Sequence, residues 1–249
     1  MEITSVNNEL VKESAKLLQK KYRNESGKFL LEGYKAIKEA FDFGIKLEKI
    51  FVEKSKISQY DFAKELIIET NSAVLKKLSS TDSAPEAVAI GLKKTYDKNV
   101  LNKSKTVLLL ENIKDLGNLG TIIRTSTAFG VDAIVLFGES VDIYNPKCVR
   151  ASVGNLWKIP IIHLTKLDEL SEIFSNFERV ATLPRSTTML KTYKPNYPLL
   201  VMFGSEADGL SDDLIRFSTT SVKIEMLDNV ESLNLATSVA VVLYRINCL

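Results

Sequence analysis

The chain has 249 residues, of which 45% are hydrophobic and 26% charged, and a formal net charge of +2, as in an ordinary globular protein with room for one large or two medium domains. No apolar run approaches the roughly 20 residues of a membrane span, and the N-terminus lacks the charged-then-apolar pattern of a secretion signal. Two cysteines and one histidine exclude a disulfide framework and a metal cluster, so we expect a cytoplasmic protein without a metal.

The first part of the chain is predicted to alternate short strands and helices. Helical spacing of apolar residues predicts a helix over residues 5–21, capped by Asn7 or Asn8, and the polar run 23–27 is interpreted as a break after it. Further helices are expected at 34–43, 59–66 and 72–78, and strands at 29–31, 49–52, 67–69 and 88–92. This alternation describes a small α/β domain.

The small net charge hides an uneven distribution. Between residues 12 and 38, eight Lys or Arg face three Glu, whereas the later two-thirds of the chain are close to neutral. A basic surface of this kind fits nucleic-acid phosphates. The alternative is a solvated helix face. The best single cluster for a phosphate contact is Lys20, Lys21 and Arg23.

The alternation restarts more strongly after residues 93–104, which are polar and lysine-rich and are interpreted as a linker. Strands are expected at 107–110, 133–137, 159–164, 180–183, 199–203 and 221–224, and helices at 119–129, 146–154, 167–174, 210–217 and 232–248. Strands that are almost wholly apolar and separated by helices predict a parallel sheet covered on both faces. The domains are therefore placed at 1–97 and 105–249.

Three polar segments in the second domain each follow an apolar, strand-like run. They are residues 118–124, 204–210 and 231–236. Ligands of open parallel sheets bind beyond the carboxyl ends of the strands, so these segments are candidates for a site.

Each segment also has a purely structural interpretation. Arg124 has the alternative of a salt bridge to Glu111 or Asp115. The glycine-containing turn at 204–210 is a common connection between strand and helix, and the third segment has the composition of an ordinary helix N-cap.

The joint pattern resembles a known family. Asn118 and Arg124, then Gly-Ser-Glu-x-x-Gly-Leu at 204–210, then Ser-Leu-Asn at 232–234 have the order and rough spacing of the signature motifs of the SpoU/TrmH family of RNA ribose methyltransferases, in the SPOUT superfamily. Residues 147–154 resemble the Arg-x-Ser-x-Gly segment of that family. Residues 3–12 and 29–33 are similar to its substrate-binding domain, which resembles a ribosomal protein that holds kinked RNA.

The resemblance implies a parallel α/β domain tied in a trefoil knot, preceded by a small α/β RNA-binding domain. It implies a homodimer that transfers a methyl group from S-adenosylmethionine to a ribose 2′-hydroxyl of structured RNA, with ribosomal RNA favoured over transfer RNA. The catalytic residues would be Arg124, Asn118, Glu206, Ser232 and Asn234. The cofactor-binding residues would be Gly204, Ile224, Met226, Leu233, Leu183 and Gly209. The RNA-binding residues would be Lys12, Lys20, Lys21, Arg23 and Arg150.

One departure and two rival classes accompany this interpretation. Glu225 stands where the family usually has Pro, which puts a charge near the cofactor loop. A non-catalytic RNA-binding protein that kept the fold is the first rival, and the joint presence of the motif residues argues against it. A Rossmann dehydrogenase is the second, disfavoured because no Gly-x-Gly-x-x-Gly follows a strand.

Overall fold

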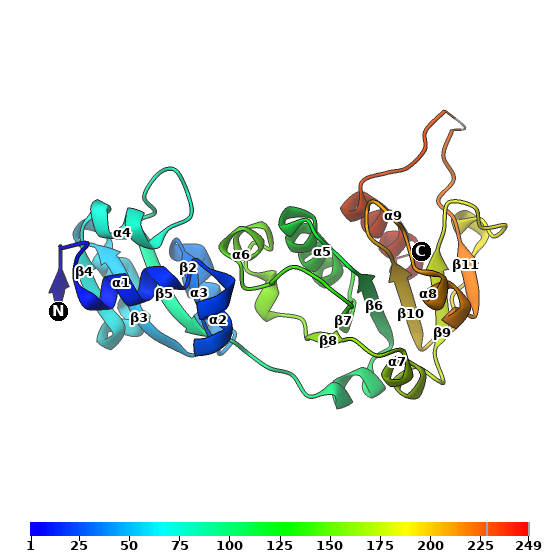
Figure 1. The fold of residues 1–249 in the computed structure, drawn as a ribbon, viewed down its shortest axis with the longest axis horizontal. Coiled ribbons are helices and arrows are strands. Elements are labelled where there is room, and N and C mark those ends of the chain that lie inside the picture. The colour runs from blue at the N-terminus through cyan, green and yellow to red at the C-terminus, as the bar shows by residue number, and fades with distance from the viewer. Residues whose placement is uncertain (228, 249) are drawn as a thin grey trace. The chain divides into compact units, whose positions relative to one another are not determined.

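The computed structural model describes residues 1–227 and 229–248, and its contacts divide the chain into two compact units (Figure 1). Unit 1 comprises Met1–Lys94 and Asp142–Trp157, and unit 2 comprises Thr95–Val141 and Lys158–Leu249. This division differs from a single cut at the predicted linker, because residues 142–157 belong to unit 1. The chain therefore passes between the units three times.

Unit 1 is built on a mixed five-stranded sheet with the order β1-β4-β3-β5-β2. β4 is parallel to β1 and β3, whereas β5 is antiparallel to β2 and β3. The strands are β1 (Glu2–Ile3), β2 (Lys28–Glu32), β3 (Leu47–Glu53), β4 (Ile67–Thr70) and β5 (Ala87–Leu92). The helices are α1 (Glu9–Lys16), α2 (Lys20–Ser26), α3 (Tyr34–Asp42), α4 (Ser72–Leu78) and α6 (Pro146–Ala151).

Two local predictions in unit 1 are wrong. The predicted first helix ends at Lys16, and the polar run taken as a break forms most of α2, which ends at Gly27 in a left-handed conformation with φ of 67°. The predicted helix 59–66 is an irregular 3₁₀ segment, Lys54–Leu66, with non-helical backbone at Tyr60 and Ala63. Tertiary packing decided the local structure in both places, since Arg23 of α2 is buried and Tyr60 and Ala63 are fully buried.

The later segment of unit 1 packs against β2. The ring of Phe29 on β2 lies 4.8 Å from the ring centroid of Tyr144 and 5.4 Å from that of Trp157. All three rings are buried. These aromatic contacts explain why a stretch encoded among the strands of unit 2 belongs to the core of unit 1.

Unit 2 is built on a six-stranded sheet with the order β11-β9-β10-β6-β7-β8, in which every pair of neighbours is parallel. The strands are β6 (Thr106–Glu111), β7 (Ala133–Phe137), β8 (Ile161–Leu164), β9 (Glu178–Thr182), β10 (Leu199–Phe203) and β11 (Thr220–Val222). All residues of β6 and β10 are buried. The predicted α/β fold with a parallel sheet is confirmed.

The helices of unit 2 are α5 (Leu116–Ala128), α7 (Leu167–Ile173), α8 (Asp212–Phe217) and α9 (Leu235–Asn247). α5 and α9 lie side by side and run in the same direction, because hydrogen bonds join Asn234 to Asn118 near their starts and Asn247 to Phe129 near their ends. The final helix was predicted from residue 232 and begins at Leu235. Of the helices within the described residues, none is long and apolar enough to cross a bilayer.

Candidate active site

The first two polar segments meet at the carboxyl edge of the parallel sheet. β6 and β10 are hydrogen-bonded neighbours, with Leu110 paired to Phe203. The chain leaves β6 toward α5 and leaves β10 into the turn at 204–209, so both segments emerge at the same edge. This edge is where open parallel sheets bind ligands.

A chain of hydrogen bonds joins all three segments. Nδ2 of Asn118 donates to Oε1 of Glu206 at 2.7 Å, and Nδ2 of Asn234 donates to Oδ1 of Asn118 at 3.1 Å. Asn234 is the N-cap of α9, and its Oδ1 accepts from the backbone N–H groups of Ala236 and Thr237 at 2.9 and 3.3 Å. We call the bonded series Glu206–Asn118–Asn234 the amide relay.

The polarity of the amide relay follows from the helix N-terminus. Backbone N–H groups only donate, so Asn234 must turn its oxygen toward α9 and its nitrogen away from it. Asn118 then presents its oxygen to Asn234 and its nitrogen to Glu206, which accepts. The orientation of an amide is often ambiguous, but here each bond fixes the next. Glu206 therefore ends the relay as an acceptor, with Oε2 outside it.

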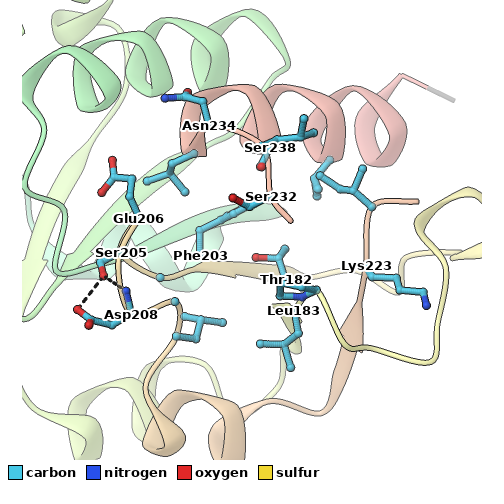
Figure 2. A pocket seen from close by; sticks show the side chains of 18 of the residues that line it. Thr182, Leu183, Phe203, Ser205, Glu206, Asp208, Lys223, Ser232, Asn234 and Ser238 are labelled. Atoms are coloured by element: carbon cyan, nitrogen blue, oxygen red, sulfur yellow. Dashed lines mark hydrogen bonds between the residues drawn. The ribbon is translucent and has the colours of Figure 1, made fainter. Parts of the chain in front are cut away.

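A cavity of about 680 Å³ lies beside the amide relay. Figure 2 shows Glu206 and Asn234 at one end of it, and Thr182, Leu183 and Lys223 at the other. Its walls come from the carboxyl ends of β9, β10 and β11, from the turn after β10 and from the start of α9.

The turn after β10 is shaped by two glycines. Ser205 and Gly209 exchange backbone hydrogen bonds of 3.1 and 3.0 Å, and Ser205 Oγ accepts from the N–H of Asp208 at 3.0 Å. A Cβ at Gly204 would overlap the backbone of Gly209 and Leu210. Gly209 has a φ of 70°. Gly204 is thus required by the close approach of two backbone segments, and Gly209 by its left-handed conformation.

The loop between β11 and α9 forms the opposite wall. Lys223, Ile224 and Met226 line the cavity. The carboxylate of Glu225 instead accepts from the backbone N–H of Lys191 at 3.3 Å and lies 4.0 Å from its ammonium. The charge that replaces the usual Pro is therefore bound to the neighbouring 3₁₀ turn, Leu190–Thr192.

The residues expected around the cofactor lie together. All six line the cavity: Gly204, Ile224, Met226, Leu233, Leu183 and Gly209. Three of the five residues expected in catalysis, Glu206, Ser232 and Asn234, line it as well, and Asn118 reaches it through the amide relay.

Arg124 lies apart from the cavity lining, on the exposed face of α5. The structure records no hydrogen bond or ion pair between its guanidinium and another described residue. Glu111, one alternative partner, is buried and accepts from the backbone N–H of Ser211 at 2.7 Å. Asp115, the other, caps α5 by accepting from the N–H of Asn118 at 2.6 Å. The salt-bridge interpretation of Arg124 is not what the structure shows.

The residues expected to bind RNA fall into two groups. Lys12, Lys20 and Lys21 are exposed on unit 1. Arg23 is only 1% exposed and is bound to Asp142, so its selection as a phosphate contact is wrong.

Arg150 is also bound within unit 1. Its Nη1 donates to Glu32 Oε2 at 3.1 Å and to Ser80 Oγ at 2.7 Å. Its side chain is 34% exposed, unlike that of Arg23, so its selection for RNA stays a prediction.

Among the cavity residues, Thr182 was given no role from the sequence, Ser205 and Asp208 were included only as members of the segment 204–210, and Ser238 was missed. The first three lie at or just after the carboxyl ends of β9 and β10, where position alone would have indicated them. Ser238 lies one helical turn after the cap Asn234, on the same face of α9. Within the parts of the chain that the structure describes, no three His, Cys, Asp or Glu side chains are grouped to hold a metal ion.

Comparison with known proteins agrees with this arrangement. Residues 105–244 match the SpoU rRNA Methylase family, and residues 8–89 match the MRM3-like substrate binding domain. An uncharacterized tRNA/rRNA methyltransferase of Synechocystis is 34% identical over 98% of this chain and 92% of its own length. The 23S rRNA (guanosine(2553)-2′-O)-methyltransferase RlmP of Bacillus subtilis is 27% identical over 98% of both chains.

Solved structures give the same result. The crystal structure of an AdoMet-bound rRNA methyltransferase from Sinorhizobium meliloti superposes with a TM-score of 0.88, at 29% identity, over 98% of this chain and 96% of that one. The family match covers more than half of the 249 residues and carries all three polar segments of the site. The chain therefore belongs to the SpoU rRNA methylase family.

Proposed function

We propose that this chain, an S-adenosylmethionine-dependent RNA 2′-O-methyltransferase of the SpoU family, methylates a ribose in structured ribosomal RNA. The observation that carries the proposal is the amide relay at one end of the cavity. It places groups that hydrogen-bond hydroxyls beside a pocket of the size that small cofactors occupy.

The cavity fits the cofactor on its own chemistry. Its volume, about 680 Å³, lies in the range of roughly 300–1,000 Å³ for small-molecule sites. Leu183, Ile224 and Leu233 supply apolar surface for an adenine ring, and Gly204 lets the backbone come close. We assign cofactor binding to these residues together with Met226 and Gly209. When bound, the cofactor supplies an electrophilic methyl group and its own leaving group.

The residues of the relay orient the acceptor in this proposal. A ribose hydroxyl is a weak nucleophile until it is deprotonated or strongly hydrogen-bonded. Glu206, held by Asn118, accepts from that hydroxyl, and Ser232 fixes the ribose. A guanidinium is a poor base, and its planar fork of N–H donors suits phosphate and oxyanion groups. We therefore assign Arg124 to an adjoining phosphate and to the charge that develops on the ribose oxygen.

Ribosomal RNA as the substrate is supported by the relatives. The Bacillus subtilis relative is named for 2′-O-methylation of a guanosine in 23S rRNA. The match of residues 8–89 to a substrate binding domain supports unit 1 as the RNA-binding module. The expected location is the cytoplasm, where bacterial ribosomal RNA is found.

A trefoil knot in unit 2 is part of the proposal. Nη2 of Arg245 on α9 donates to the carbonyls of Lys191 and Tyr193 at 2.8 and 3.3 Å. The backbone of Lys223 bonds to the same stretch, at Thr188 and Leu190. The final helix and the loop before it are thus both bound to residues 188–193, as a knotted path through that stretch would require.

A homodimer is proposed on the exposed face of α9. Val241 and Tyr244 are 38% and 49% exposed there, and Tyr244 contacts Phe129 at the end of α5. A second copy would cover these apolar side chains. It would also bring Arg124, which lies on the exposed face of α5, toward the cavity of its partner.

Substitution of Arg124 tests the assignment of catalysis. Arg124→Ala should leave stability and cofactor affinity unchanged, because the side chain is exposed and bound to no described residue. Methyl transfer should fall by about 10²–10³-fold, the usual effect of removing one group that stabilises developing charge. Arg124→Lys keeps the charge without the planar fork, so its rate of methyl transfer should lie between those of the unaltered chain and Arg124→Ala.

The readouts are calorimetry with the cofactor and transfer of a radioactive methyl group to ribosomal RNA. Near-normal turnover in Arg124→Ala would contradict the catalytic role assigned to Arg124. Failure of the unaltered chain to bind cofactor would favour a non-catalytic RNA-binding protein instead.

A further inference from the structure

Two of the places where the chain passes between the units are tied together within unit 1. The chain leaves unit 1 after Lys94 and re-enters it at Asp142. The hydroxyl of Tyr144 accepts from the backbone N–H of Lys94 and donates to its carbonyl, each at 2.9 Å. Tyr144 is buried against Phe29. Residues 93–94 and 142–144 are therefore anchored to one another beside α2.

Positive charge is concentrated at this point. Nε of Arg23 lies 2.7 Å from Oδ2 of Asp142, and the side chain of Arg23 is buried while that of Asp142 is 9% exposed. The ammonium of Lys93 donates to Oδ1 of Asn24 at 2.9 Å. Lys20 precedes Asn24 by four residues on α2, so the two share a helix face. We call Lys20, Arg23, Asn24, Lys93 and Asp142 the crossover patch.

Each oxygen of the carboxylate in the crossover patch already accepts one hydrogen bond, and neither bond comes from a lysine. Asp142 binds Arg23 through Oδ2 and accepts from the backbone N–H of Tyr144 at 2.9 Å through Oδ1. Lys93 is left with a neutral amide oxygen and with the Tyr144 ring, whose centroid is 5.4 Å from its ammonium.

The electrostatics of Lys93 agree with this geometry. Partial burial lowers the pKa of the Lys93 ammonium. Asp142 opposes that effect, while the positive charges of Arg23 and Lys20 lower the pKa further. The patch thus holds more positive charge than its own carboxylate compensates, and an anion placed between the lysines would relieve the excess.

We propose that Lys20 and Lys93 bind a phosphodiester group of the substrate RNA at the point where the chain crosses from unit 1 to unit 2. This inference rests on the proposed function. Lys20 is exposed, as are Lys21 on α2 and Lys12 on α1. A backbone with one negative charge per nucleotide matches such a series of lysines better than a single small anion does.

The proposal changes the roles that the sequence alone indicated. Arg23 was selected as a phosphate contact, and Lys93 was placed in the linker. In the structure Arg23 binds Asp142 and therefore holds the two chain segments of the crossover patch together. Lys93 presents its charge beside α2 and becomes the contact.

The test measures RNA binding by the full chain over a series of salt concentrations. The double variant Lys20→Gln with Lys93→Gln should lower the slope of log affinity against log salt by about 0.7–0.9 for every phosphate that the variant no longer neutralises. Lys93→Arg should keep the slope. Lys77→Gln is the matched control, because it removes one exposed lysine from α4 of the same unit. It should behave like the unaltered chain.

Each outcome decides the proposal. An unchanged slope in a double variant that melts like the unaltered chain overturns it. Displacement of the RNA by inorganic phosphate at matched ionic strength also overturns it, because that result describes a site for a small anion. Lys93→Met keeps the aliphatic stem over the Tyr144 ring and replaces Lys93→Gln if the latter does not fold. A chain that shows the predicted slope change yet methylates no RNA contradicts the proposed function and leaves the patch supported.

Discussion

At the edge of the parallel sheet, each polar side chain of the amide relay determines the orientation of the next. Asn234 turns its oxygen to α9, so Asn118 receives a donor and directs its own nitrogen at Glu206. A change at one residue therefore alters what a distant residue presents to a ligand. Arg124 differs from these residues, because it is exposed and no hydrogen bond to another described residue fixes its orientation.

We predict that Gly204 does not tolerate substitution even by alanine, which adds a single carbon. Its Cβ would overlap the backbone of Gly209 and Leu210, so Gly204→Ala must shift the turn that lines the cavity. We expect a loss of about 1–3 kcal/mol in stability, as for other overpacked sites, together with weaker cofactor binding. Thermal melting and calorimetry measure the two effects. Gly130→Ala is the control for cofactor affinity, since a Cβ at Gly130 would meet no atom within 4 Å and Gly130 does not line the cavity. Equal cofactor affinity in both variants would contradict the prediction.

Tyr60 should make the protein sensitive to alkali. It is fully buried, and its hydroxyl finds no partner among the described residues. Burial, followed by Glu86 and Tyr34, raises the pKa of this tyrosine in the folded state. Below the ordinary tyrosine pKa of about 10, ionisation of Tyr60 does not affect the free energy of unfolding. The free energy of unfolding falls as pH rises above that value, because Tyr60 ionises more easily in the unfolded chain than in the folded one.

Tyr60→Phe removes the buried hydroxyl and should raise the free energy of unfolding by about 1–3 kcal/mol, the cost of an unsatisfied polar group. It should also flatten the fall in stability above about pH 10. Denaturant unfolding from neutral to alkaline pH checks both expectations. Tyr22→Phe, at a partly exposed tyrosine, serves as the control. A less stable Tyr60→Phe protein would mean that the hydroxyl has a partner after all.

At the scale of elements, the strands of unit 2 could be predicted because burial on both faces leaves nearly continuous apolar runs, as in β6 and β10. Motif order then placed the glycine turn after β10 and the relay residues at the edge of the sheet. What could not be predicted depended on partners far away in sequence. α2 contains a buried Arg23 whose partner, Asp142, is 119 residues away, so its polar composition indicated a loop.

The start of α9 shows the same limit at a helix end. Ser232, Leu233 and Asn234 all have plausible places in a first turn, and only the cap hydrogen bonds identify Asn234 as the boundary. Asn234 then has two functions, since its oxygen caps α9 and its nitrogen holds Asn118. Sequence alone does not reveal this second bond.

Asn234→Ser separates the two functions. A serine oxygen caps a helix about as well as asparagine, so the stability of α9 should change little. The donor to Asn118 is lost, so turnover should fall while cofactor affinity and melting temperature stay close to normal. Asn234→Ala removes both functions and should also cost about 1 kcal/mol of stability. If Asn234→Ser retains full turnover, the relay does not position the acceptor.

For the whole molecule, the important fact is that two compact units do not correspond to two continuous segments. Residues 142–157 leave unit 2 between β7 and β8 and pack against β2 of unit 1. Deleting residues 1–97 would therefore remove the ring of Phe29, which packs against Tyr144 and Trp157, and would expose both side chains. The two units are joined by three chain crossings, two of which meet at the crossover patch.

Mixed dimers would show whether Arg124 completes the cavity of its partner. Arg124→Ala and Gly204→Ala should each be nearly inactive alone. In a mixed dimer one cavity is intact and faces an intact Arg124 from the other chain, so random mixing should restore about a quarter of normal activity for a symmetric pair. Adding Val241→Glu and Tyr244→Glu to both chains should abolish the recovery, because the exposed face of α9 would no longer associate. If sedimentation shows that mixed dimers form and they recover no activity, Arg124 acts in the cavity of its own chain.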